Sequence, residues 1–231
     1  LDSLAQRFDV VAIDLNGFGF TERPSDPGNY TLAGQSHLVL GVLGALGVDR
    51  ATVAGHSYGG ALALYLASRH PERVERLLLI DNAMPRYFFE QRREVFRWHW
   101  LASLMTRTTG LGDRRIRKGL LASYYNDSKV TTELFEAYAS RLRIEGAVDA
   151  YRGLLGPSEE PPVDHDLATI PQPTLVVWGA EDELIPAAAA RKVSARLPHG
   201  RYVEIPRCGH SPMEECPAEF LDAVDPFLAG N

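Results

Sequence analysis

The serine at position 57 lies in a pattern that can make a nucleophile. Residues 55–59 read Gly-His-Ser-Tyr-Gly, between an apolar run at 51–54 and a helix-like run at 61–67. A serine on a sharp strand-to-helix turn has an exposed hydroxyl and a strained backbone, and we expect bulky side chains two residues away on either side to clash. Because Ala61 and Leu62 follow the motif where a phosphate loop requires lysine, the pattern predicts nucleophilic catalysis rather than phosphate binding.

A serine hydroxyl becomes a good nucleophile only when a base takes its proton and a third group orients that base. Asp182 follows the apolar run 174–178, and His210 follows the run 201–205. In open α/β sheets the carboxyl ends of the strands form the edge where sites assemble. The sequence therefore predicts that a carboxylate and a histidine meet Ser57 at one edge of a sheet.

The elements that position these residues are visible as short apolar runs. They are near-continuous rather than alternating, as in strands buried on both faces of a parallel sheet. The predicted strands are 8–13, 51–54, 77–80, 174–178 and 201–205. The predicted helices are 31–47, 59–69, 186–197 and 217–229. This alternation predicts an α/β fold with a mostly parallel central sheet flanked by helices.

One segment interrupts the alternation. About ninety residues separate the runs 77–80 and 174–178, far more than a typical α/β loop. Apolar and aromatic residues recur in it at helical spacing, so we predict a helical cap over 85–165, inserted into a core made of 1–84 and 166–231. Its many arginines between 86 and 118 indicate a solvated helix face rather than an anion-binding or membrane-binding surface.

The composition is ordinary for a globular protein, with 45% hydrophobic residues, 23% charged residues and a net charge of −6. This balance gives no reason to expect nucleic acid as a partner, and no run is long enough for a membrane span. Cys208 and Cys216 are too few for a disulfide framework and lack zinc-like spacing, so we expect a reducing, cytoplasmic compartment and no metal. The start at Leu1 leaves the question of a signal peptide open.

Gly17-Phe18-Gly19 lacks the third glycine of a dinucleotide site, and we expect no cofactor.

Four blocks of the chain resemble the α/β-hydrolase superfamily. They are the segment 14–21, the serine motif 55–60, the loop 178–186 and the loop 209–217. Within that superfamily, the chain is similar to the cap-bearing group of carboxylesterases, carbon–carbon bond hydrolases and haloperoxidase-like enzymes. The resemblance covers nearly the whole chain outside the predicted cap, and the order Ser, Asp, His is the order of this family.

The resemblance implies a role for each residue. Ser57 is the nucleophile, His210 is the general base and then the acid, and Asp182 orients His210. The backbone N–H of Tyr58 is one of two oxyanion donors. Serine at position 57 is unlike the haloalkane dehalogenases and epoxide hydrolases of the superfamily, which use aspartate.

Other carboxylates and histidines compete for these roles. Asp81 is the main rival acid, because some relatives place the acid after the preceding strand. Asp182 would alternatively cap the helix beginning near Pro186, with Glu181 or Glu183 carrying the function. His56 is next to the nucleophile but is expected to point away from it. His37, His70 and His199 suit surface or capping roles, and His210 is also favoured over His99 and His165.

One motif of the family is missing upstream of Asp14. The family carries His-Gly after its third strand, where a backbone N–H completes the oxyanion hole, and this chain has His-Gly only at 199–200. We therefore expect the first three strands and the second oxyanion donor to belong to a longer protein, with roughly 40–50 more residues. The absent third strand would pair with 8–13 and 51–54, and its loss would leave unpaired N–H and C=O groups costing about 1–3 kcal/mol each.

These residues predict a serine hydrolase that cleaves a small-to-medium carboxylic ester through an acyl-enzyme. Carbon–carbon cleavage of ring-fission products, perhydrolysis and acyl transfer use the same triad, and a non-catalytic ligand-binding member is the alternative from another class. Trp98, Tyr125 and Leu184 are the predicted pocket residues, and the oligomeric state is not predicted. A small acyl substrate is the expected partner.

Overall fold

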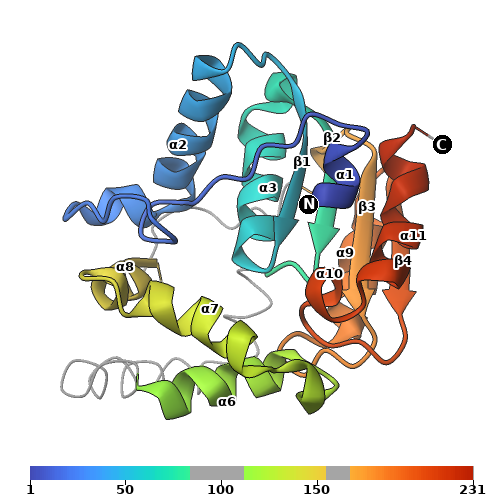
Figure 1. Cartoon of the computed structure of the whole chain (residues 1–231). Coiled ribbons are helices and arrows are strands. Elements are labelled where there is room, and N and C mark those ends of the chain that lie inside the picture. Colours follow the sequence, from blue (N-terminus) through green and yellow to red (C-terminus); the bar gives the residue numbers. More distant parts are fainter. Residues whose placement is uncertain (84–111, 155–166, 231) are drawn as a thin grey trace.

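The computed structural model describes residues 1–83, 112–154 and 167–230 (Figure 1). Its centre is a parallel four-stranded sheet in the order β1-β2-β3-β4. The strands are β1 (Ala51–His56), β2 (Val74–Ile80), β3 (Thr174–Gly179) and β4 (Gly200–Ile205). The predicted α/β fold is confirmed, and β2 begins three residues before the predicted run 77–80.

Successive side chains of the two central strands enter two different cores, because neighbouring residues of a strand point to opposite faces. On one face, α3 (Tyr58–Arg69) and α9 (Ala187–Arg196) cover the sheet, and α2 (Leu32–Ala45) packs on α3. On the other face lies α11 (Pro217–Leu228). Buried strand residues on the α3 face are Leu77, Leu79, Val176 and Trp178, and those on the α11 face are Leu78, Ile80, Leu175 and Val177. Every residue of β3 is buried, which explains its unbroken apolar sequence.

Residues 8–13 are not a strand, and that part of the prediction is wrong. They follow the short α1 (Asp2–Ala5) and belong to no β-ladder, and Val10 and Val11 are 38% and 48% exposed. Among the described residues, no strand pairs with this segment or with the outer edge of β1. A strand is defined by hydrogen bonds to a neighbour, so apolar composition alone does not produce one here.

The chain between β2 and β3 contains helices, as predicted. Its described part comprises α6 (Asp113–Ser123), η3 (Asp127–Lys129), α7 (Thr132–Leu142) and α8 (Ala147–Leu154), which lie beyond the carboxyl ends of the strands (Figure 1). These helices have an apolar cluster of their own, formed by Ile116, Leu120, Tyr124, Val130, Phe135 and Ala139. The remaining residues of the predicted cap, including Trp98, lie outside the described residues. No helix in the described ranges is long and apolar enough to cross a membrane.

Candidate active site

Ser57 stands on the turn between β1 and α3. Its φ of 51° and ψ of −116° are strained for a residue with a side chain. Backbone hydrogen bonds hold the turn: Ser57 N–H donates to Ile80 C=O at 3.0 Å, and Ser57 C=O accepts from the N–H groups of Gly60 at 3.0 Å, Ala61 at 3.3 Å and Ala83 at 2.8 Å. The end of β2 therefore fixes the strained conformation that the sequence motif predicts.

The structure corrects the expected roles of the glycines. A Cβ on Gly55 would lie 2.1 Å from the Gly59 carbonyl oxygen, so this glycine is required by space. A Cβ on Gly59 would meet nothing within 4 Å, so the expected clash two residues after the serine is absent. The crowded position is one residue later, where a Cβ on Gly60 would lie 2.2 Å from Asn82 Cβ. The packing of α3 against the end of β2 causes this crowding.

Asp182 and His210 meet at the carboxyl ends of β3 and β4. His210 Nδ1 lies 2.8 Å from Asp182 Oδ2, and both residues are buried. The other carboxylate oxygen, Oδ1, accepts from the backbone N–H groups of Leu184 at 2.8 Å and Ile185 at 2.9 Å. Since an ionised carboxylate only accepts, His210 carries its proton on Nδ1 and presents the Nε2 lone pair. The alternative in which Asp182 caps α9 is not observed, because Pro186 is the N-cap residue and no side chain caps that helix.

Within the described residues, no hydrogen bond joins Ser57 Oγ to His210. Such a bond is often long or poorly aligned in an enzyme without substrate. The structure thus brings Asp182 and His210 into direct contact, and it places Ser57 after β1, which β2 separates from β3.

His56 lies beside His210, which the sequence did not indicate. The two ring centroids are 4.8 Å apart, and His56 Nε2 is 2.7 Å from the backbone carbonyl oxygen of His210. Burial, together with His210, lowers the pKa of His56 to about 4. A neutral His56 therefore donates Nε2–H to that carbonyl and supports the loop that carries His210.

Asp81, the rival acid, also belongs to this region. It follows β2, is fully buried, and accepts from Gly179 N–H at 3.1 Å through Oδ1. One side-chain oxygen of Asp81, one of Asp182 and one ring nitrogen of His210 lie within 4.8 Å of one another. Asp182, and not Asp81, makes the hydrogen bond to the imidazole.

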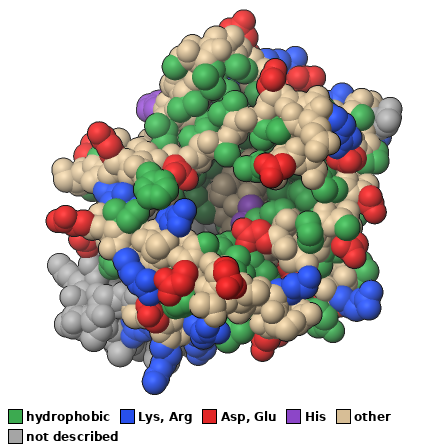
Figure 2. All heavy atoms as spheres, viewed as in Figure 1, with side chains coloured by type: hydrophobic (Ala, Val, Ile, Leu, Met, Phe, Trp, Pro, Cys, Tyr) green, Lys and Arg blue, Asp and Glu red, His purple; other side chains and the backbone are tan. Residues whose placement is uncertain are grey.

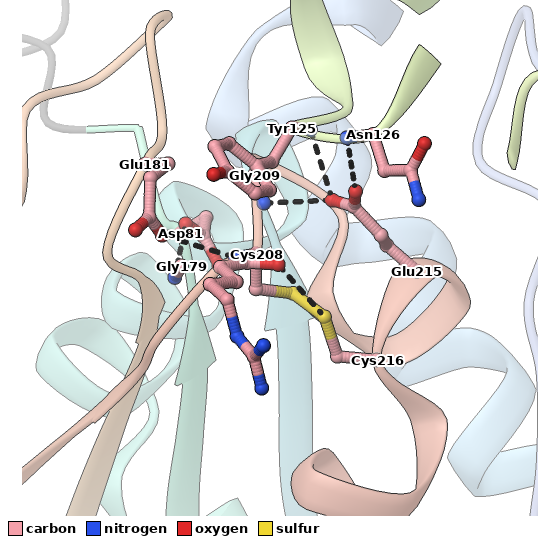
Figure 3. The surroundings of a disulfide bond; sticks show 10 residues. Asp81, Tyr125, Asn126, Gly179, Glu181, Cys208, Gly209, Glu215 and Cys216 are labelled. Carbon is pink, nitrogen blue, oxygen red and sulfur yellow. Dashed lines mark hydrogen bonds between the residues drawn. A yellow bond between two sulfur atoms is a disulfide. The ribbon is translucent and has the colours of Figure 1, made fainter. Parts of the chain in front are cut away.

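Glu215 joins the histidine loop to the helical insertion, and its role was not predicted from the sequence. It lies at the end of α10 (Pro212–Glu215), with only 4% of its surface exposed. Its carboxylate accepts from Gly209 N–H at 2.7 Å, Asn126 N–H at 2.7 Å and Tyr125 N–H at 3.1 Å (Figure 3). Three donors from two segments that are far apart in the sequence converge on one buried carboxyl group next to the loop that carries His210.

We expect Glu215→Gln to lower kcat/KM by about 10–100-fold, because an amide has one acceptor oxygen for three backbone donors and small displacements of catalytic groups are costly. Unfolding in urea should show a loss of about 1–3 kcal/mol. Glu219→Gln, an exposed residue of the following helix, is the matched control and should behave as the unmodified protein. Equal kinetics for the two variants would contradict this role.

The segment 14–21 lies against the start of α3. Asn16 N–H donates to Gln35 Oε1 and Gln35 Nε2 donates to Asn16 C=O, both at 3.0 Å, so α2 holds this loop through a fully buried amide. The Phe18 ring stacks on the Tyr58 ring with centroids 6.4 Å apart. Tyr58 is the first residue of α3, where backbone N–H groups point away from the helix, as an oxyanion donor must.

The surface is hollowed over the carboxyl end of β1, and hydrophobic side chains and a histidine lie at the hollow (Figure 2). Of the predicted pocket residues, Tyr125 is 52% exposed and Leu184 packs against the main core. Trp98 lies outside the described residues. The pocket roles of all three therefore remain predictions.

Cys208 and Cys216, whose pairing was not predicted, form a disulfide across the histidine loop (Figure 3). No disulfide framework was predicted from two cysteines, and this single bond was not expected, whereas the compartment stays a prediction. The residues between them include His210 and Glu215. A turn that returns through α10 brings the two sulfur atoms together, and their spacing in the sequence does not indicate it.

Comparison with known proteins identifies the family. A family model described as alpha/beta hydrolase fold matches residues 1–217. The chain is an α/β hydrolase. This α/β hydrolase is 33% identical to 2-hydroxymuconate semialdehyde hydrolase of Pseudomonas putida over an alignment 227 residues long, which covers 95% of this chain and 76% of the relative.

Two solved structures show the same fold. A meta-cleavage product hydrolase from Pseudomonas fluorescens IP01 has a TM-score of 0.79 and 25% identity, with 99% of this chain and 82% of that chain covered. A membrane phospholipase A, a bacterial virulence factor, has a TM-score of 0.80 and 29% identity, with 99% and 72% covered. This α/β hydrolase is thus similar both to a meta-cleavage product hydrolase and to a phospholipase A.

Proposed function

We propose that this α/β hydrolase is a serine hydrolase that cleaves a carbon–carbon bond of a ring-cleavage product, with Ser57, His210 and Asp182 as its triad. The observation that carries the chemistry is the Asp182–His210 hydrogen bond beside the strained serine turn. The substrate class rests on the similarity to 2-hydroxymuconate semialdehyde hydrolase and to the meta-cleavage product hydrolase.

In this mechanism His210 Nε2 accepts the Ser57 proton as Oγ attacks the keto or aldehyde carbon of a vinylogous diketone. The Tyr58 N–H stabilises the resulting oxyanion. The protonated His210 then returns a proton as the carbon leaving group departs, and water releases the acyl group from Ser57 with His210 again as base. Asp182 stabilises the imidazolium and fixes its orientation throughout.

The ester reaction predicted from the sequence is the second candidate, and it is favoured by the similarity to a phospholipase A. An ester requires the same attack on a carbonyl carbon, but its alkoxide leaves more readily than a carbanion. The two reactions therefore differ in the leaving group and in the pocket that receives it, and the triad is common to both.

Steady-state kinetics with both substrate classes separate these proposals. We expect 2-hydroxymuconate semialdehyde to reach a kcat/KM of at least about 10⁴ M⁻¹s⁻¹. This value should exceed that of any p-nitrophenyl ester in a series of increasing acyl length by tenfold or more. Faster turnover of an ester would favour the second candidate, and failure of a fluorophosphonate probe to label Ser57 would contradict both.

A further inference from the structure

Asp81 is a buried carboxyl group whose hydrogen bonds are incomplete. None of its surface is exposed, and its φ of 39° places a non-glycine residue in the left-handed region. The backbone N–H of Asp81 donates to Val177 C=O at 3.1 Å, which ties the residue to β3. Oδ1 accepts from Gly179 N–H at 3.1 Å (Figure 3), whereas Oδ2 has no partner among the described residues. A charged oxygen in this position would be costly.

A second carboxyl group, that of Asp182, lies within 4.8 Å of Asp81. Two carboxylates buried this close together do not both ionise at neutral pH. Their hydrogen bonds decide which one holds the proton. Asp182 accepts from three N–H groups, those of Leu184, Ile185 and His210, and so is stabilised as an anion. Asp81 accepts from only one, and its second oxygen is free to carry hydrogen.

We propose that Asp81 is a protonated carboxylic acid whose Oδ2 hydroxyl donates to Asp182, which makes Asp81 a positioning residue of the triad. This inference rests on the proposed function for the catalytic role of Asp182. The hydroxyl satisfies the unpartnered oxygen and adds a fourth donor to the Asp182 anion, without placing a second charge beside His210.

The charges around Asp81 agree with this assignment. Burial and the charge of Asp182 raise the pKa of Asp81 to about 10, whereas the Gly179 N–H acts in the opposite direction and is the smaller effect. The titratable groups that face Asp81 are Asp182 from the loop after β3 and His210 from the loop after β4. His56 lies on the ring of His210 and is neutral above pH 4.

The hydrogen bond from neutral Asp81 to Asp182 affects His210, the proposed general base. By sharing the negative charge of Asp182, the Asp81 hydroxyl weakens the attraction between Asp182 and protonated His210. The weaker attraction favours the neutral imidazole, which is the form that accepts the serine proton.

The first test does not require activity. Folded Asp81 keeps its proton while unfolded Asp81 loses it above about pH 4, so the contribution of Asp81 to stability falls as the pH rises from about 4 to about 10. Asparagine does not titrate, and it tolerates a positive φ. The Tm of Asp81→Asn minus that of the unmodified protein should therefore rise by roughly 5–15 °C between pH 5 and pH 9. A Tm difference that stays constant between pH 5 and pH 9 would overturn the proposal. It would mean that Asp81 is ionised in the folded protein as well as in the unfolded protein across this range.

The second test follows the pH dependence of Ser57 labelling by a fluorophosphonate. The labelling rate falls at acid pH, and the midpoint of this fall is called the acid limb. In Asp81→Asn the amide replaces the hydroxyl as hydrogen-bond donor to Asp182, so the acid limb should stay within about 0.3 pH unit of its position in the unmodified protein. An ionised Asp81 predicts instead that the limb moves to lower pH by about one unit, because a negative charge beside His210 is removed.

The companion variant is Asp81→Gly, which also tolerates φ 39° but removes the donor. Its acid limb should move to higher pH by about half a unit or more. An unchanged acid limb in Asp81→Gly would overturn the positioning role.

If neither variant folds, infrared spectroscopy of the unmodified protein tests the proposal. We expect the band of a protonated carboxyl group at pH 7 and its loss as the pH rises towards 10. Absence of this band at pH 7 would overturn the proposal. Absence of labelling in the unmodified protein would count against the proposed function only, since the Tm and infrared measurements do not depend on it.

Discussion

Ser57→Ala is expected to lower kcat by about 10⁴–10⁶-fold and to abolish labelling by a fluorophosphonate probe. The substitution removes the one atom that forms the acyl-enzyme, while alanine keeps the Cβ and faces the same strain at φ 51°. The Ile80, Gly60 and Ala83 backbone hydrogen bonds that hold the turn do not involve the hydroxyl. The free energy of unfolding should therefore change little while the reaction stops.

Single-turnover kinetics and mass spectrometry of the trapped acyl-enzyme measure this effect. Ser123→Ala is the matched control, because the Ser123 hydroxyl bonds, among the residues that the structure describes, only to Gly119 C=O of its own helix. It should keep full activity. If Ser57→Ala retained more than about 1% of kcat with Ser123→Ala unaffected, another residue would be the nucleophile.

The serine turn and the Asp182–His210 pair were predictable because each depends on short-range patterns. Glycine and serine spacing specifies the turn, and apolar runs mark the strand ends where Asp182 and His210 follow. Parallel strands then bring those ends to one edge of the sheet, whatever the helices between them contain. The structure agrees with the sequence at these positions because topology alone places them.

The remaining features depend on contacts that cross the chain. Residues 8–13 have the composition of a strand, but pairing requires a neighbour that composition cannot supply. The space beside Gly60 is filled by Asn82, and Glu215 receives donors from residues 125 and 126. Such contacts leave no periodic signal in a single sequence. Asp81 is an intermediate case: its place after a strand made it a rival acid, while only the geometry shows two carboxyls side by side.

Asp182→Asn should lower kcat/KM by about 10⁴-fold at neutral pH. The reason lies in the two oxygens of Asp182. Oδ1 accepts from Leu184 and Ile185 N–H groups, so the amide oxygen of asparagine must take that place. The amide NH₂ then faces His210 Nδ1 and donates to it, which moves the imidazole proton to Nε2. A histidine protonated at Nε2 has no lone pair to accept the Ser57 proton.

The pH dependence of kcat/KM and the ¹⁵N shifts of the His210 ring measure this change of tautomer directly. Glu183→Gln, an exposed neighbour in the same loop, is the control and should change kcat/KM less than about twofold. If Asp182→Asn remained within tenfold of the unmodified enzyme, Asp81 would have to be the acid that orients His210, and the double variant with Asp81→Asn would then lose the remaining activity. We expect instead that the double variant is no worse than Asp182→Asn, because a neutral acid that acts only through Asp182 has nothing left to position once the Asp182 charge is gone.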